Sequence, residues 1–235
     1  MANANGSFGL RPLSKQGGAS NSTGMTQYSA YEIANGNTNK LYHGEPVIPL
    51  STGYIDAPGA AAGGTVGMLG VFQGCEYVSS TTGKTVWSNY WPGSGADSNH
   101  PVKAYVNDDP MQLYVIATDA SWTSKATARA AVFANANFST AITGTDATGV
   151  SLGRLAISTI ATTAALQMRI VGWVDDPENA DFSAAGIGAI VLIARRPNET
   201  PVASVPVIAV EKLAFAKTAA RAVALLVHEA SVAIT

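Results

Sequence analysis

Charged side chains are scarce in this chain of 235 residues. They account for 13% of the sequence, about half of what an ordinary soluble domain carries, and Ala, Thr, Ser, Asn and Gly take their place. The net charge is −2 without any run of Lys or Arg, which excludes a protein that follows a nucleic-acid backbone. Small polar side chains lose little rotamer entropy on immobilisation, so this composition suits packing against neighbours, although an ordinary monomer with a polar surface has it too.

Additional cysteines, long apolar runs and a secretory signal are also missing. Cys75 is the only cysteine, which excludes an intrachain disulfide and predicts a buried, unreactive thiol. The longest uncharged apolar stretch, 187–194, is far shorter than the roughly 20 residues of a membrane-spanning helix. The N-terminus has neither the basic nor the apolar region of a secretory signal, so we expect synthesis in the cytoplasm and no membrane partner.

The motifs of the common enzyme classes are absent. The sequence has no Gly-x-Ser-x-Gly elbow, no phosphate-binding Gly-x-x-x-x-Gly-Lys-Ser/Thr loop and no dinucleotide-binding glycine pattern. The three histidines lie far apart, and the acidic residues of 175–181 lack the residue order of a calcium loop, which favours a solvated turn over an ion site. We therefore predict no catalysis, no cofactor and no metal.

The sequence does contain a series of short segments typical of β-strands. Val, Ile, Tyr, Phe and Thr are frequent in them, and Gly, Asn, Asp or Pro lie between them. The loop 79–84 predicts a hairpin, and the Asn-Asp-Asp-Pro turn at 107–110 predicts a second pair of strands around it. The expected strands are 25–34, 40–43, 45–50, 65–75, 76–78, 85–90, 102–106, 111–118, 155–160, 166–174 and 187–194.

Two segments are predicted to be helical, and both ends of the chain differ from its middle. Residues 124–135 are rich in Ala, and 210–230 have the spacing of an amphipathic helix. These patterns divide the chain into an N-terminal arm (1–24), a β domain (25–194), and a linker with an amphipathic C-terminal helix (195–235). The predicted fold is mainly β, an antiparallel β-barrel or sandwich-like domain with an extended N-terminal arm and a C-terminal helix.

Three aromatic residues, Trp87, Tyr90 and Trp91, fall close together after the predicted hairpin. Flat rings with a polar edge can form a platform on which sugars stack. Packing in the core or at a subunit interface is the commoner use of such rings, and we favour it here.

Several stretches together resemble a family of virion structural proteins of tailed phages. They are GSFGLRP at 6–12, LGVFQGCEY at 69–77, WSNYWP at 87–92, DDP at 108–110 and ALQMRIVGWVDDPEN at 165–179. The resemblance covers roughly residues 6–194, and the tail after Arg195 departs from the family's pattern. It implies a decoration or cement protein that binds the outside of the capsid, with a β-barrel-like domain that clusters as trimers.

The resemblance also implies partners and a location. The partners are the major capsid protein and other copies of this chain in a homotrimer, and the location is the capsid surface of the virion, with assembly in the bacterial host cytoplasm. We expect the N-terminal arm to bind the shell through Phe8, Leu10, Arg11 and Pro12, by threading onto a neighbour or adding a strand to its sheet. Weak contacts to several shell subunits at once would add up by multivalency.

Three other functions remain open at this point. The first is a carbohydrate- or receptor-binding module of a phage tail or fibre, which the aromatic residues at 87–91 would suit. The second is the main shell subunit, which usually needs a long spine helix and a longer chain. The third is a small hydrolase, for which the sequence offers no motif.

Overall fold

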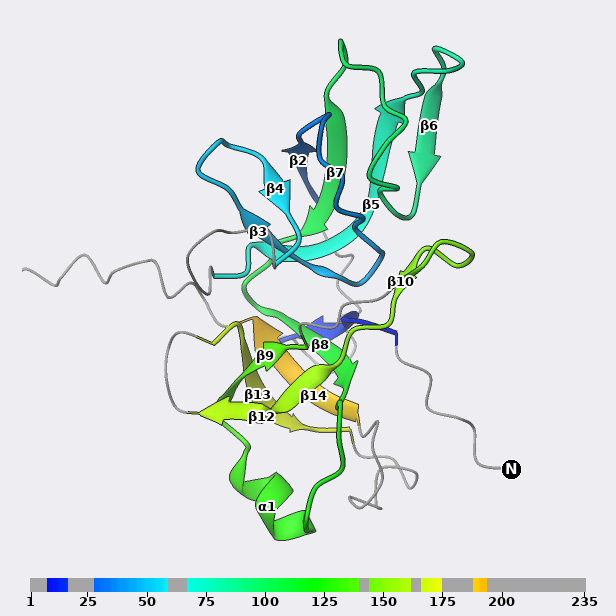
Figure 1. The fold of residues 1–235 in the computed structure, drawn as a ribbon. Helices are drawn as coiled ribbons and strands as arrows, with labels where there is room; N and C mark the ends of the chain where they lie inside the picture. Colours follow the sequence, from blue (N-terminus) through cyan, green and yellow to red (C-terminus); the bar gives the residue numbers. More distant parts are fainter. Residues whose placement is uncertain are drawn as a thin grey trace, which may run out of the picture. The chain divides into compact units, whose positions relative to one another are not determined.

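The computed structural model describes residues 8–16, 28–58, 67–139, 144–161, 166–174 and 188–193. They belong to one compact unit, Met1–Pro197, whose strands pair antiparallel, and the predicted mainly β fold is confirmed (Figure 1). The second unit, Asn198–Thr235, lies outside the described residues, as does the predicted linker and helix at 195–235.

Six strands form a first sheet, which we call sheet I. In spatial order they are β1 (Arg11–Lys15), β8 (Gln112–Ala117), β14 (Gly188–Ile193), β13 (Met168–Trp173), β9 (Asn135–Phe138) and β12 (Leu155–Ala161). A single parallel bridge joins Thr118 to Leu155, so β12 returns to the end of β8. No further pairing among the described strands closes the sheet, so the predicted barrel is not formed.

Six more strands form sheet II. They are β2 (Ser29–Ile33), β7 (Val102–Asn107), β5 (Gly70–Val78), β3 (Pro46–Pro49) and β4 (Ile55–Asp56), with β6 (Thr85–Ser88) beside β5. The hairpin predicted around 79–84 is confirmed, because β5 and β6 pair antiparallel. The segments predicted as two strands, 65–75 and 76–78, meet in β5, because a β-bulge between Phe72 and Gly74 bends the strand without ending it.

The turn at 107–110 connects the two sheets, so the predicted pairing of the strands around it is wrong. β7 pairs with β2 and β5 in sheet II, whereas β8 pairs with β1 and β14 in sheet I. Asp108 accepts a hydrogen bond from Tyr31 Oη in β2 at 2.7 Å. Asp109 forms an ion pair of 2.7 Å with Lys15 in β1, which holds the pKa of Asp109 below its ordinary value. The two carboxylates therefore fix the turn to different sheets.

Residues 8–16, predicted to be part of an arm, are integrated into the folded unit. β1 pairs with β8, Leu10 is 1% exposed, and Leu10 N donates a hydrogen bond to Gly44 O at 2.7 Å. Gly9 has a φ of +68°, and a Cβ at this position would lie 2.6 Å from Gly44 O. Both the left-handed backbone and the close contact with Gly44 require glycine at position 9. Gly9 and Leu10 of the GSFGLRP stretch therefore anchor β1.

Replacing Gly9 by alanine is expected to destabilise the protein by more than the left-handed backbone alone would cost. That backbone costs about 1–2 kcal/mol for a residue with a Cβ, and the contact with Gly44 adds to it. Gly53→Ala is the matched control, because Gly53 has a φ of +87° and no atom within 4 Å of its added Cβ. Urea unfolding of the two variants measures the difference, and equal losses would contradict the proposed close contact.

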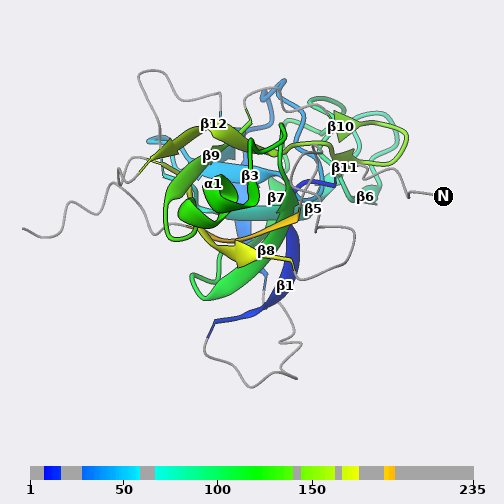
Figure 2. The same cartoon turned by 90° about the horizontal axis from the view of Figure 1, so that it is seen from below.

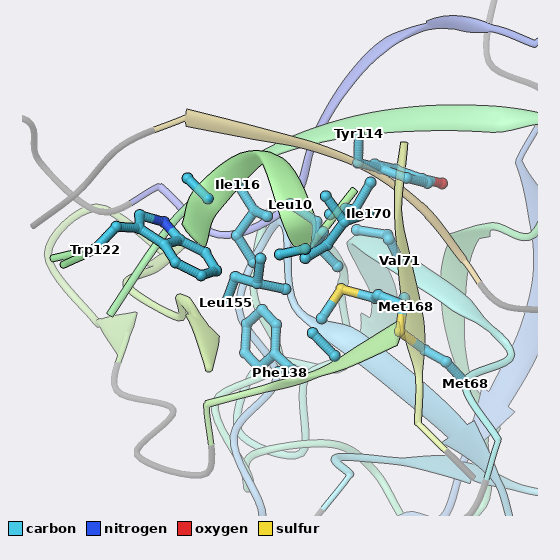
Figure 3. Close-up of a cluster of buried hydrophobic side chains, with 14 residues drawn as sticks. Leu10, Met68, Val71, Tyr114, Ile116, Trp122, Phe138, Leu155, Met168 and Ile170 are labelled. Carbon is cyan, nitrogen blue, oxygen red and sulfur yellow. The ribbon is translucent and has the colours of Figure 1, made fainter. Parts of the chain in front are cut away.

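Two clusters of buried side chains make up the core. The first combines Tyr114 and other side chains of sheet I with Met68 and Val71 of the β5 region, so it joins both sheets (Figure 3). The second fills the inner face of sheet II and includes Phe72 and Trp91. Cys75 belongs to the second cluster, and burial raises the pKa of its thiol to about 12, which agrees with the predicted unreactive cysteine.

One helix and one small hairpin complete the described structure. The predicted helix is confirmed as α1 (Lys125–Ala130), which begins after Ser124, whose side chain accepts a hydrogen bond from Thr127 N. Ala128 of α1 is buried, and its carbonyl accepts a hydrogen bond from Trp173 Nε1 of sheet I at 3.1 Å. Figure 2 shows α1 in the view from below. β10 (Gly144–Thr145) and β11 (Val150–Ser151) form the hairpin.

Candidate functional site

The three aromatic residues singled out in the sequence lie in different surroundings. Trp91 is fully buried, donates a hydrogen bond from Nε1 to Asn37 O at 3.2 Å, and packs edge-on against Tyr77. Tyr90 is half-buried and stacks on Tyr42 with ring centres 5.7 Å apart. Trp87 is 68% exposed. Trp91 is therefore a core residue, whereas Trp87 is available at the surface.

Trp87 belongs to a group of side chains on the outer face of sheet II. The strand registers place Glu32, Lys103, Glu76 and Trp87 in one row across β2, β7, β5 and β6. The Trp87 ring lies nearly parallel to the ring of Tyr105, at 11° and 5.7 Å between centres. We call these five residues the Trp87 face.

Hydrogen bonding fixes the centre of the Trp87 face. Tyr105 Oη donates to Glu76 Oε2 at 2.9 Å. Desolvation and this hydrogen bond raise the pKa of Tyr105 above its ordinary value, so the phenol keeps its proton and remains a donor. Because Tyr105 cannot swing away without losing this bond, it supports the Trp87 ring in one position.

A pocket opens beside the Trp87 face. Its volume is about 130 Å³. The lining residues are Glu76, Tyr77, Val78, Thr85, His100, Pro101 and Lys103. His100 Nδ1 lies 2.9 Å from Asp97 Oδ2. Hydrogen bonds from Asn99 N and His100 hold the pKa of Asp97 below its ordinary value, so this carboxylate stays ionised and orients the imidazole.

Another exposed aromatic side chain lies in the turn between α1 and β9. Phe133 is 68% exposed and has a φ of +72°, a left-handed conformation that a bulky side chain rarely adopts. Phe133 N donates to Ile170 O at 2.8 Å, and the Arg169 guanidinium donates from Nε to Phe133 O at 3.4 Å. Arg129 lies one helical turn before it in sequence. Phe133 with Arg129 and Arg169 is called the Phe133 turn below.

The residues predicted to bind a shell lie at the start of sheet I. Leu10 is a core residue, so the prediction that it contacts a partner is wrong. Arg11 is exposed, and its guanidinium lies 4.7 Å from the centre of the half-buried Phe8 ring. Pro12 is half-buried in β1. These three residues form the outer part of an anchored strand.

Among the described residues, no three His, Cys, Asp or Glu side chains gather to hold a metal ion, and no helix is long and apolar enough to cross a membrane. Comparison with family models, curated proteins and solved structures gave no match to this chain. The Trp87 face and the Phe133 turn carry the two most exposed aromatic rings of the described residues, and their own chemistry indicates what they bind.

Proposed function

We propose that this chain is a structural protein of a tailed-phage particle that binds the outside of the capsid and stabilises the shell without catalysing a reaction. The resemblance of residues 6–194 to virion proteins supports the assignment of this chain to a phage particle. The exposed Phe133 turn supports a contact between the chain and the shell. The proposed partner is the major capsid protein, and the proposed location is the capsid surface.

The single observation that carries this proposal is the exposed Phe133 ring on a left-handed backbone. The conformation costs about 1–2 kcal/mol, and an exposed ring regains little of that cost in the free protein. Burial of the ring against a partner would regain it. Arg169 donates a hydrogen bond to the Phe133 carbonyl, and Arg129 lies four residues before Phe133 in the sequence. Arginine, like the aromatic residues, is enriched in the dominant contacts of protein interfaces.

A homotrimer would strengthen such a contact. Each copy offers one Phe133 turn, so a trimer would engage three neighbouring shell subunits, and linked contacts raise the overall affinity by a factor of about 10² or more over a single one. The low charge of the chain fits this role, because few charged groups would have to be desolvated between neighbours. Light scattering of the purified protein tests the trimer directly.

Replacing Phe133 by alanine is expected to weaken binding to empty heads at least about tenfold, because a central aromatic contact of an interface would be lost. Co-sedimentation with heads assembled from the phage's own shell protein measures this. Phe133→Gly controls for folding, since glycine adopts the left-handed backbone freely and should keep or raise stability while removing the ring. Tyr54→Ala removes an exposed aromatic ring just before β4 of sheet II and should bind normally.

Depletion of the protein from whole particles tests the reinforcing role. Mild denaturant should release this protein before the shell opens, and the bare shells should then rupture at a lower temperature. Adding back the native chain should restore the rupture temperature, whereas Phe133→Gly should not. Depleted shells that keep their thermal endurance would contradict the proposal.

A receptor- or carbohydrate-binding module of a tail or fibre is the second candidate, and the exposed Trp87 ring favours it. The two candidates differ in where the chain lies in the particle and in how many copies a particle holds. A decoration protein would be present in numbers comparable to the shell subunit. A tail module would be present in a few copies and would remain with tails separated from heads.

A further inference from the structure

We propose that the Trp87 face is a saccharide-binding site, which takes a hexopyranose with equatorial substituents as one unit of an oligosaccharide. The inference does not depend on where the chain lies in a particle, because the face would bind the sugar in the free protein. It assigns a ligand to sheet II, whereas the proposed shell contact lies in the turn between α1 and β9.

The platform for the sugar is the Trp87 ring. Hexopyranoses with equatorial substituents present a flat face of C–H groups, which stacks on an aromatic ring. Trp87 is 68% exposed, and its parallel contact with Tyr105 fixes the ring before any ligand arrives. Little side-chain entropy is then lost when a sugar binds, so the stacking contact contributes fully to affinity.

The polar groups that a sugar needs lie in the same row. Glu76 is directly opposite Trp87, and directly opposite residues have Cβ atoms about 4.5–5.5 Å apart. Glu76 Oε2 accepts from Tyr105, and the second carboxylate oxygen can accept from a sugar hydroxyl. Lys103, opposite Glu76 on the other side, supplies a donor. One acceptor and, one strand further on, one donor therefore lie on the same side of the platform.

The pocket beside the platform gives room for a substituent or a neighbouring sugar unit. Thr85 and His100 line it together with Glu76 and Lys103, so hydroxyl, imidazole, carboxylate and ammonium groups converge there. A few placed polar groups around an apolar surface are the usual composition of a small-molecule site.

The same row argues against a protein as the occupant. Interface centres between proteins are depleted in charged residues, whereas Glu32, Lys103 and Glu76 lie side by side next to Trp87. A protein seated here would have to desolvate all three charges. A sugar covers its own surface with hydroxyls and can hydrogen-bond to charged groups that stay partly in water.

Calorimetric titration of the purified full chain with cellotetraose and chitotetraose, followed by a glycan array, tests the site. We expect saturable binding, weakened at least about tenfold by Trp87→Ala and less strongly by Glu76→Gln. Trp87→Phe keeps a flat ring and should bind between the native chain and Trp87→Ala. Phe133→Ala removes an equally exposed aromatic ring outside the Trp87 face and should bind sugar as the native chain does.

Two results would overturn the assignment. One is a folded native chain that binds neither tetrasaccharide and no hexopyranose on the array. The other is sugar binding that Trp87→Ala leaves unchanged. If Trp87→Ala instead abolishes binding to empty heads, the face is a protein interface and the saccharide assignment is wrong, whereas the shell-binding function would stand.

Discussion

Replacing Trp91 by alanine is expected to destabilise the protein by about 3–5 kcal/mol, the range for a large aromatic side chain removed from a core. The ring is fully buried in the core of sheet II, packs against Tyr77, and donates a hydrogen bond to Asn37 O. Its removal leaves a cavity and takes the Nε1 hydrogen bond away from the partly buried carbonyl of Asn37. Urea unfolding followed by circular dichroism measures the loss.

Trp87→Ala is the matched control for this experiment. The same substitution on an exposed ring should cost about 1 kcal/mol or less, chiefly the stacking contact with Tyr105. If Trp91→Ala does not fold, Trp91→Phe keeps most of the ring and should show a smaller, measurable loss. Similar losses for alanine at the two positions would contradict the assignment of one ring to the core and one to the surface.

Stability is expected to fall as pH rises from 4.5 to about 7, because of one buried carboxyl group. Glu45 is 2% exposed, and burial, followed by the charge of Asp56, raises its pKa to about 7. Between these pH values Glu45 holds a proton in the folded chain that it has lost in the unfolded chain. The stabilisation from Glu45 is therefore complete below pH 4.5 and disappears above about pH 7. Its size is on the order of 3 kcal/mol.

Glu45→Gln removes the titrating group and keeps an oxygen that can accept the hydrogen bond from Tyr42 N, which is 2.7 Å in the native chain. The thermal unfolding midpoint of this variant should therefore change less over the same pH range. Differential scanning calorimetry at several pH values measures both proteins. A native chain whose midpoint rises through this window, or a variant with the same slope, would contradict the account of Glu45.

Local pattern was enough to predict most strands but not all of their partners. Alternating burial along β7 and β8 follows from sequence, and both strands lie where expected. Their separation into two sheets depends on distant partners, because β7 pairs with β2 and β5 whereas β8 pairs with β1 and β14. A turn sequence specifies a change of direction, but these long-range contacts decide which sheet each strand joins.

Within the predicted N-terminal arm, the strand at 11–15 was missed for a related reason. Residues 17–24 and the first residues of the chain are rich in Gly, Ser and Asn, which hid the strand between them. β1 owes its order to pairing with β8 and to burial of Leu10, contacts made with residues far along the chain. Only a non-local partner makes such a short segment part of a sheet.

The candidate sites were predicted in part. Proximity in sequence grouped Trp87 with Trp91, yet strand alternation in β6 and the return of the chain to Leu41 place the two rings in different surroundings. Tyr105 and Glu76 join Trp87 only through strand registers, which a single sequence does not reveal. Phe133 gave no signal at all, because glycine or asparagine is the residue normally expected at a left-handed position.

Cryo-electron microscopy of the intact particle tests the central claim most directly. The account predicts this β-rich chain on the outer surface of the shell, in threefold clusters, with the Phe133 ring buried against the major capsid protein. A bare shell, or a chain attached to the shell with Phe133 still exposed to solvent, would contradict it.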